Sequence, residues 1–133
     1  MAETKVTLKH GFRVGDHQFM VATIRETTSG DVIEANEESE KVVMVPTEDA
    51  RGNLVTEAQL VTSPTLVGIN VMRRQIVAID DYSGPLSLAE VKSLHPEDLN
   101  LLQAGVNQLD QLAAKALEGV AERGRDEGAG ESA

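Results

Sequence analysis

Residues 63–102, "SPTLVGINVMRRQIVAIDDYSGPLSLAEVKSLHPEDLNLL", contain three separate signals for the start of a helix. Ser63 is a typical N-cap and is followed by a proline at the first helical position, and Pro96 begins another helix in the same way. Between them, Ser87 and Glu90 have the Ser-x-x-Glu spacing of a capping box. The stretch therefore predicts several helices with well-defined starts, and it contains no recognisable catalytic motif.

The helix that begins at Pro96 is predicted to run to about Glu122, because apolar residues recur along it at steps of three and four. We expect its first half to pack in the core. Its second half, from about Leu109, is expected to extend past the surface that a small domain can cover, where it could bind a partner helix or a second copy. The candidate partner-binding residues are Leu99, Leu102, Val106, Leu109, Leu112, Ala116 and Arg74.

Arg73 and Arg74 form the only adjacent pair of arginines. Neighbouring helix positions point about 100° apart, so the two side chains cannot face the same way. One or both could pair with residues 26–62, which carry nine acidic and two basic side chains. Alternatively, one of them is an exposed contact to a partner. The helix before them, from Pro64, is expected to be buried, with a strand as the alternative for residues 75–79.

The N-terminal part predicts strands. Residues 4–25 read as a β-hairpin that turns at Gly15-Asp16, and a short acidic helix capped by Thr28 or Ser29 follows over residues 30–40. Residues 42–45 and 54–61 predict a second extended pair, or else a loop. The expected fold class is α+β: an N-terminal β-hairpin, with a possible second extended pair, packed on a C-terminal helical part. Residues 1–122 are expected to form one domain, and residues 123–133 a disordered tail.

Composition excludes several classes of function. The chain has 133 residues, a net charge of −10 and no cysteine, which argues against binding to nucleic acids or anionic membranes and against cysteine-based sites. There is no phosphate-binding glycine loop, secretory signal or membrane-length apolar run. His10, His17 and His95 lie far apart in sequence, and His95 is read as an N-cap residue. We therefore expect no catalytic, cofactor or metal site, and no enzyme activity.

Four phrases of the sequence, in this order, resemble a known family. They are "VTLKHGFRVGDHQF" (6–19), "VATIRETTSGDVIEA" (21–35), "VMRRQIVAI" (71–79) and "GPLSLAEVKSLHPEDLNLLQAGVNQL" (84–109). The layout is similar to that of the tail assembly chaperones of Mu-like and related contractile-tailed phages and prophages, over roughly residues 4–112. The resemblance implies a protein of the cytoplasm of the infected or lysogenic bacterial host that is absent from the mature virion. It would bind the long helical tape measure protein and keep it soluble until the tail tube polymerises.

Two other readings stay open. A minor structural component of the phage tail or baseplate would share the same make-up of hairpin and helices, but would be found in purified particles. An acidic DNA-mimic inhibitor is suggested by the clustered carboxylates of residues 26–62. Self-association is compatible with each of these functions.

Overall fold

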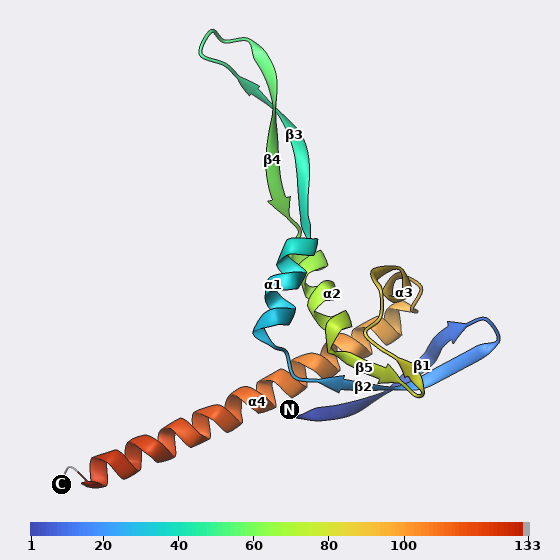
Figure 1. The fold of residues 1–133 in the computed structure, drawn as a ribbon, viewed down its shortest axis with the longest axis vertical. Coiled ribbons are helices and arrows are strands. Elements are labelled where there is room, and N and C mark those ends of the chain that lie inside the picture. Colours follow the sequence, from blue (N-terminus) through green and yellow to red (C-terminus); the bar gives the residue numbers. More distant parts are fainter. Residues whose placement is uncertain (132–133) are drawn as a thin grey trace. The chain divides into compact units, whose positions relative to one another are not determined.

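The computed structural model describes the backbone of residues 1–131 and the side chains of residues 1–119 (Figure 1). It divides into two compact units, one formed by Met1–Thr27 together with the chain from Met72 onward, and the other by Thr28–Val71. Helix α2 (Pro64–Gln75) begins in the second unit and ends in the first. The α+β class is confirmed, because the N-terminal hairpin packs on the long C-terminal helix. The prediction of one domain over residues 1–122 stays a prediction.

An antiparallel sheet in the order β1-β2-β5-β6 is the frame of the first unit. Its strands are β1 (Glu3–Val14), β2 (His17–Arg25), β5 (Ile76–Ile79) and β6 (Tyr82–Ser83). The predicted turn at Gly15-Asp16 is confirmed, and Gly15 has the positive φ that a tight hairpin turn favours. Of the two alternatives for residues 75–79, the strand is correct, since Ile79 of β5 pairs with Ala22 of β2.

Two helices complete the first unit, α3 (Leu88–Lys92) and α4 (Pro96–Glu131). The predicted capping box at Ser87 and Glu90 is confirmed, with both reciprocal hydrogen bonds present. The His95 carbonyl accepts the first hydrogen bonds of α4, so His95 is its cap residue as predicted. Helix α4 ends at Glu131 rather than near Glu122. Residues 132 and 133 lie outside the described residues, and the predicted disorder of residues 123–133 remains untested.

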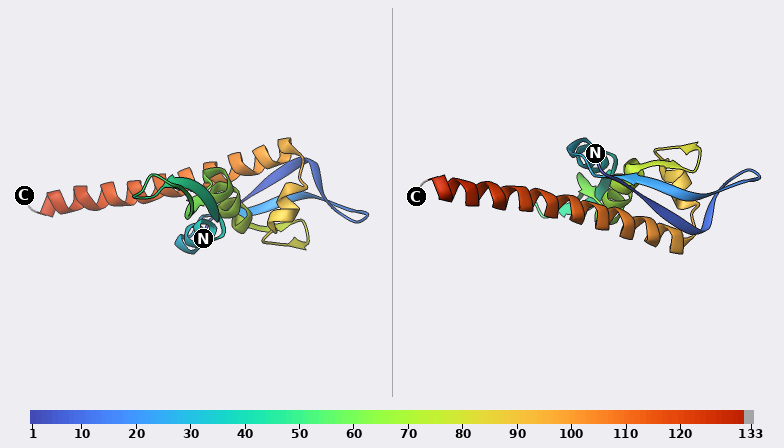
Figure 2. Two further views of the ribbon diagram at one scale, coloured as in Figure 1. Left: turned by 90° about the horizontal axis from the view of Figure 1, so that it is seen from above. Right: turned by 90° about the horizontal axis from the view of Figure 1, so that it is seen from below.

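The core of the first unit lies between the sheet and α4. In both views of Figure 2, the first half of α4 lies along the sheet and the second half continues past it. The buried apolar side chains are aliphatic for the most part, as the low aromatic content of 2% requires. Phe12, Phe19 and Tyr82 contact one another, with ring centroids 5.1 to 6.4 Å apart. All three aromatic residues of the chain therefore lie together in this unit.

The second unit contains α1 (Ser29–Glu38), β3 (Glu40–Glu48) and β4 (Leu54–Thr62), followed by the first turns of α2. Thr28 and Asp31 form a capping box at the start of α1. The hydroxyl of Ser39 donates to the Ala35 carbonyl and accepts from the side-chain amide of Asn70, which links α1 to α2. Strands β3 and β4 pair along their whole length, so the second extended segment is a hairpin and not a loop.

Candidate functional site

Helix α4 contains most of the residues that the sequence singled out as a partner-binding surface. Leu102, Val106 and Leu109 are at most 6% exposed, and they form its contact with the sheet. Their spacing of three and four residues places them on one face of the helix. Leu99, one turn earlier, is half-buried. Leu102, Val106 and Leu109 therefore stabilise the first unit itself, and a partner could reach them only by displacing the sheet.

The contact between α4 and the sheet is close because of a glycine. A Cβ atom on Gly105 would lie 2.5 Å from Cγ2 of Val6 and 3.2 Å from Cδ1 of Ile24. Two non-bonded carbon atoms do not approach to 2.5 Å, so any larger residue at position 105 would push α4 away from β1. Only glycine allows the helix to lie this close to the strand. Gly105 therefore sets the position of α4 on β1 and β2.

Exposure rises sharply on α4 after Leu109. Leu112 is 57% exposed, Leu117 is 72% exposed, and Ala116 between them is also exposed. Ala116 and Leu117 lie seven and eight residues after Leu109, so they continue the same helical face that is buried further up. Leu112 instead borders a shallow cavity of about 140 Å³ between β1 and α4, lined by Thr4, Lys5, Val6, Gly105, Gln108, Leu109 and Leu112. The apolar stripe of α4 therefore extends further along the helix than the sheet that covers its first half.

Arg74, the remaining candidate, is half-buried at the end of α2, and its carbonyl accepts a hydrogen bond from Nη2 of Arg25 at 2.8 Å. Nη1 of Arg73 donates to the Leu86 carbonyl at 3.2 Å. Within the first unit the side chains of Arg25 and Arg73 therefore help to hold neighbouring segments together. The predicted pairing of Arg73 or Arg74 with the acidic segment, and the predicted role of Arg74 as a partner contact, both stay predictions.

The junction between β1 and the start of α4 is built around Asp98, a residue that sequence reasoning placed only in the first turn of a helix. Its carboxylate is fully buried and accepts from the backbone N–H groups of Lys9 at 2.6 Å and of His10 and Gly11 at 3.0 Å each. The register of β1 against β2 shifts at this point, between Thr7 and Phe12. The irregularity turns three donors towards one carboxylate, and the positive φ of Gly11 permits it.

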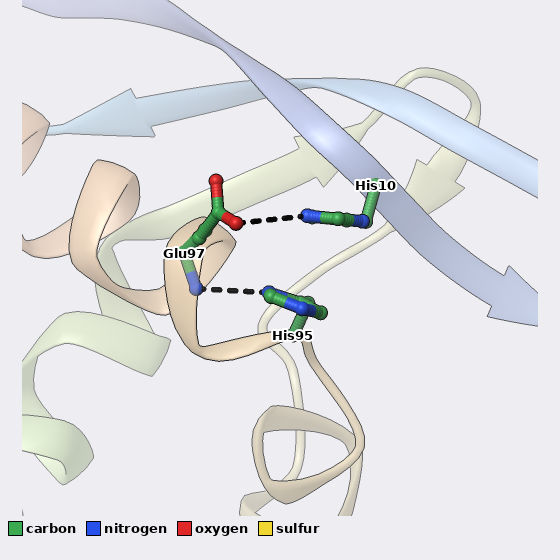
Figure 3. Close-up of side chains that lie close together, drawn as sticks. All are labelled: His10, His95 and Glu97. Carbon is green, nitrogen blue, oxygen red and sulfur yellow. Dashed lines mark hydrogen bonds and ion pairs between the residues drawn. The ribbon is translucent and has the colours of Figure 1, made fainter.

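The same junction brings His10 of β1 together with His95 and Glu97, which lie at the start of α4 and far from His10 in sequence (Figure 3). The two imidazole rings are stacked with centroids 3.6 Å apart. Nε2 of His10 lies 3.5 Å from a carboxylate oxygen of Glu97, and Nζ of Lys9 lies 3.0 Å from its other oxygen. Hydrogen bonds from Lys9, and then from His10, hold the pKa of the Glu97 carboxyl below its ordinary value of 4.5.

Two histidines and a carboxylate form a donor set that suits zinc, and their nearest ligand atoms lie within 4.8 Å of one another. The arrangement nevertheless uses those atoms in another way. Nδ1 of His95 accepts a hydrogen bond from the backbone N–H of Glu97, so the neutral ring carries its proton on Nε2. The stacked rings also direct their in-plane lone pairs side by side rather than to one point. As it stands, the cluster joins β1 to the first turn of α4.

The Asp80-Asp81 pair lies in the turn between β5 and β6. The carboxylate of Asp80 accepts from the backbone N–H groups of Met20 at 2.8 Å and Val21 at 3.3 Å. Asp80 also has a positive φ of 52°, as a residue in a two-residue hairpin turn requires. This carboxylate therefore joins the turn to strand β2.

Among residues 1–131, no helix is both long and apolar enough to cross a membrane.

Comparison with known proteins adds a family to this geometry. The profile described as "Tail assembly protein gp41" matches residues 8–125. The chain is 36% identical over 121 residues to the Mu-like prophage FluMu protein gp41 of Haemophilus influenzae, covering 91% of this chain and 87% of the relative. It is also 36% identical over 122 residues to the probable tail assembly protein gp41 of Escherichia phage Mu, covering 89% of this chain and 77% of the relative. A third relative, the probable tail assembly protein FS-gp41 of the same phage, is 36% identical over 114 residues, or 56% of its own length. No solved structure matches the chain.

Proposed function

This chain belongs to the tail assembly protein gp41 family, which has members in phage Mu and a Mu-like prophage, and from this membership we propose that it is a tail assembly chaperone. A role in phage tail assembly follows from the names of its relatives. The finer proposal is that the chain binds the tape measure protein through an aliphatic helical surface and keeps that protein soluble while the tail is built.

One observation carries this proposal, namely the apolar stripe of α4 that continues after the sheet ends. Leu109 is 6% exposed, whereas Leu117, two turns later on the same face, is 72% exposed. Amphipathic helices commonly bind each other through such stripes, with anchor residues at intervals of three and four. Ala113 and Ala116 keep the surface between the leucines low, so a partner helix can approach closely.

The composition of this surface suits a protein that must release its partner. Leucine and alanine supply apolar area without the aromatic anchors that usually dominate tight interfaces. The net charge of −10 makes copies of the chain repel one another, which limits aggregation of the complex. Weak, reversible binding by a highly charged protein suits a chaperone that keeps an apolar partner in solution.

We further propose that the chain acts in the cytoplasm of the bacterial host and is absent from the mature virion. This separates the chaperone from the alternative function, a minor structural component of the tail or baseplate. Quantitative mass spectrometry of purified virions distinguishes them: a stoichiometric amount of this chain in the particle would support the structural role.

The direct test is co-expression of the tagged chain with the tape measure protein of the same phage, followed by affinity purification. We expect the tape measure protein to become soluble and to co-purify. The double variant Leu112→Ser/Leu117→Ser should lower its recovery about tenfold, because both side chains are more than half exposed on the part of α4 that follows the buried Leu109. Leu101→Ser is the matched control, since Leu101 is a 40% exposed leucine of α4 in the part that lies along the sheet.

If the tape measure protein stays insoluble while the tagged chain is soluble and purifies alone, the chaperone proposal is overturned. Equal recovery with the double variant and with the control would leave the chaperone role in place and remove α4 as its binding surface.

A further inference from the structure

One face of the β3–β4 hairpin is mainly apolar along its middle. Residues directly opposite each other in an antiparallel pair share a face, and faces alternate along each strand. The register pairs Val42 with Leu60 and Met44 with Ala58, and two residues further along each strand Pro46 faces Thr56. We call the surface made by these six residues and Leu54 the hairpin face.

The exposure of this face is high and one-sided. Val42, Met44 and Leu60 are 61 to 68% exposed, and Leu54 is 78% exposed. On the opposite face, Val43 and Val45 are half-buried, while Val55 and Val61 are 43% and 41% exposed. A two-stranded hairpin is marginally stable in water unless something packs on it, and a contiguous exposed apolar patch indicates an interaction site.

The charges of the hairpin face describe what it can bind. The charged residues that border it on the same side of the hairpin are Glu40 and Glu48, one at each end of β3, and both are exposed. They lie eight residues apart, which corresponds to about 27 Å of strand. A rod with apolar side chains along its middle and a basic residue near each end is complementary to that pattern. About 18 residues of α-helix span the same length, and a helix about 10 Å wide covers two adjacent strands.

We propose that the hairpin face binds an amphipathic α-helix whose apolar stripe is flanked by lysine or arginine. This inference rests on the proposed function, and it identifies the helix as a segment of the tape measure protein that is held in addition to the segment on α4. The adaptable side chain of Met44 at the centre of the face suits a partner that offers many similar helical segments.

A second copy of the chain is a poorer fit. Two hairpin faces packed about a two-fold axis in antiparallel directions would place Glu40 of one copy near Glu48 of the other, so like charges would meet at both ends. Pairing of two hairpins through their strand edges would avoid this repulsion, but it would leave the apolar side chains of the face in water. A helix of opposite charge solves both problems.

The experiment uses the full-length tagged chain co-expressed with the tape measure protein, in three variants. The first, Val42→Thr/Met44→Thr/Leu60→Thr, removes apolar area from the hairpin face and keeps residues that favour strands. The matched control, Val55→Thr/Val61→Thr, makes the same kind of change on the opposite face. The third, Glu40→Gln/Glu48→Gln, removes the two charges with almost no change in shape. Far-UV circular dichroism of each variant checks that the hairpin is retained.

We expect the first variant to lower recovery of the tape measure protein at least about tenfold and the control to leave it within about twofold. The charge variant should bind the tape measure protein a few-fold more weakly at low salt, because it lacks the two ion pairs. Its binding should also depend less on added salt, because salt weakens the wild-type complex by screening these ion pairs. Since this variant leaves the apolar surface intact, it tests the proposal even if the first variant fails to fold.

If the wild-type chain, the first variant and the charge variant all recover the same amount of tape measure protein, this inference is overturned and the chaperone proposal stands. If the wild-type chain itself recovers no tape measure protein, the chaperone proposal fails and this inference fails with it. Analytical ultracentrifugation of the chain alone gives a third check. A dimer that the first variant converts to a monomer would show that a second copy covers the face, which would also overturn the proposal.

Discussion

The carboxylate of Asp98 is expected to be the most important polar group for the stability of the first unit. Asp98→Ala removes the acceptor of three backbone N–H groups, from Lys9, His10 and Gly11, at a fully buried position. A hydrogen bond to a charged group contributes about 1.5–3 kcal/mol, and a donor left without a partner costs about 1–3 kcal/mol. Water can reach part of the irregular strand, so we take the low end for each bond. Three bonds at about 1.5 kcal/mol each give an expected loss of about 4.5 kcal/mol, a large part of a typical domain stability of about 5–15 kcal/mol.

Urea unfolding followed by tyrosine fluorescence measures this loss. Tyr82 is the only tyrosine, the chain has no tryptophan, and Tyr82 contacts Phe12 in the same unit as Asp98, so its signal reports on that unit alone. With a slope of about 2 kcal/mol per molar urea, a loss of about 4.5 kcal/mol lowers the midpoint by about 2 M. Asp98→Asn should lower it by less, because an amide oxygen still accepts from some of the three donors.

Glu97→Gln is the control for the Asp98 variants. It neutralises the neighbouring carboxylate of the same helix turn, which is exposed and interacts with Lys9 and His10 through its side chain. We expect only a small change in the midpoint, since exposed ion pairs contribute little. A midpoint for Asp98→Ala that lies no lower than that of Glu97→Gln would refute the reasoning, because the buried hydrogen bonds would then carry no more stability than a surface contact.

Three further predictions test other parts of the structure. Gly105→Ala should destabilise the chain by about 1–3 kcal/mol in thermal unfolding, because the new methyl group would meet Val6 at 2.5 Å, whereas Gly68→Ala, where a Cβ meets nothing within 4 Å, should stabilise it by up to about 1 kcal/mol. Ser87→Ala should cost about 0.5–2 kcal/mol, since it removes the hydroxyl that caps α3, and Ser87→Asp should restore most of that loss in the same assay. The backbone N–H of Ser87 and then the Tyr82 hydroxyl lower the pKa of the Glu90 carboxyl, so Glu90 stabilises the fold above its ordinary pKa of 4.5 and loses this contribution as the pH falls through the lower folded value. Urea midpoints should accordingly decline below about pH 4.5, less steeply for Glu90→Gln than for the wild type, and equal slopes would contradict the assignment.

Features that depend on residues near one another in sequence were predictable. The capping residues Thr28 and Ser87, and the proline that begins α4, act on backbone groups within one turn of themselves. The alternation of strand residues before Gly15-Asp16 and the many β-forming residues after this turn were enough to predict the first hairpin. In each case the interaction that forms the element closes over a few residues, so its signal can be read in a short window of sequence.

Features that depend on distant pairings were not predictable. Asp98 reads as an ordinary acidic residue of a first helical turn, yet it binds a strand that lies 87 to 89 positions earlier. The approach of His10 to His95 and the placement of β5 beside β2 depend on how the chain returns on itself. The hairpin face is a similar case, because its apolar side chains lie on both β3 and β4, and only the register aligns them.

The sequence by itself determined the α+β class, the starts of the helices and the apolar stripe of α4, because propensity, capping and periodicity are local properties of the chain. The expected division of that stripe near Leu109 rested only on the small size of the domain, and the tertiary structure supplies its physical cause. The sheet ends near Leu109, so the same repeat of leucine and alanine is core before that residue and exposed surface after it. Burial depends on what lies opposite a side chain, and this is set by contacts between segments that the local sequence does not specify.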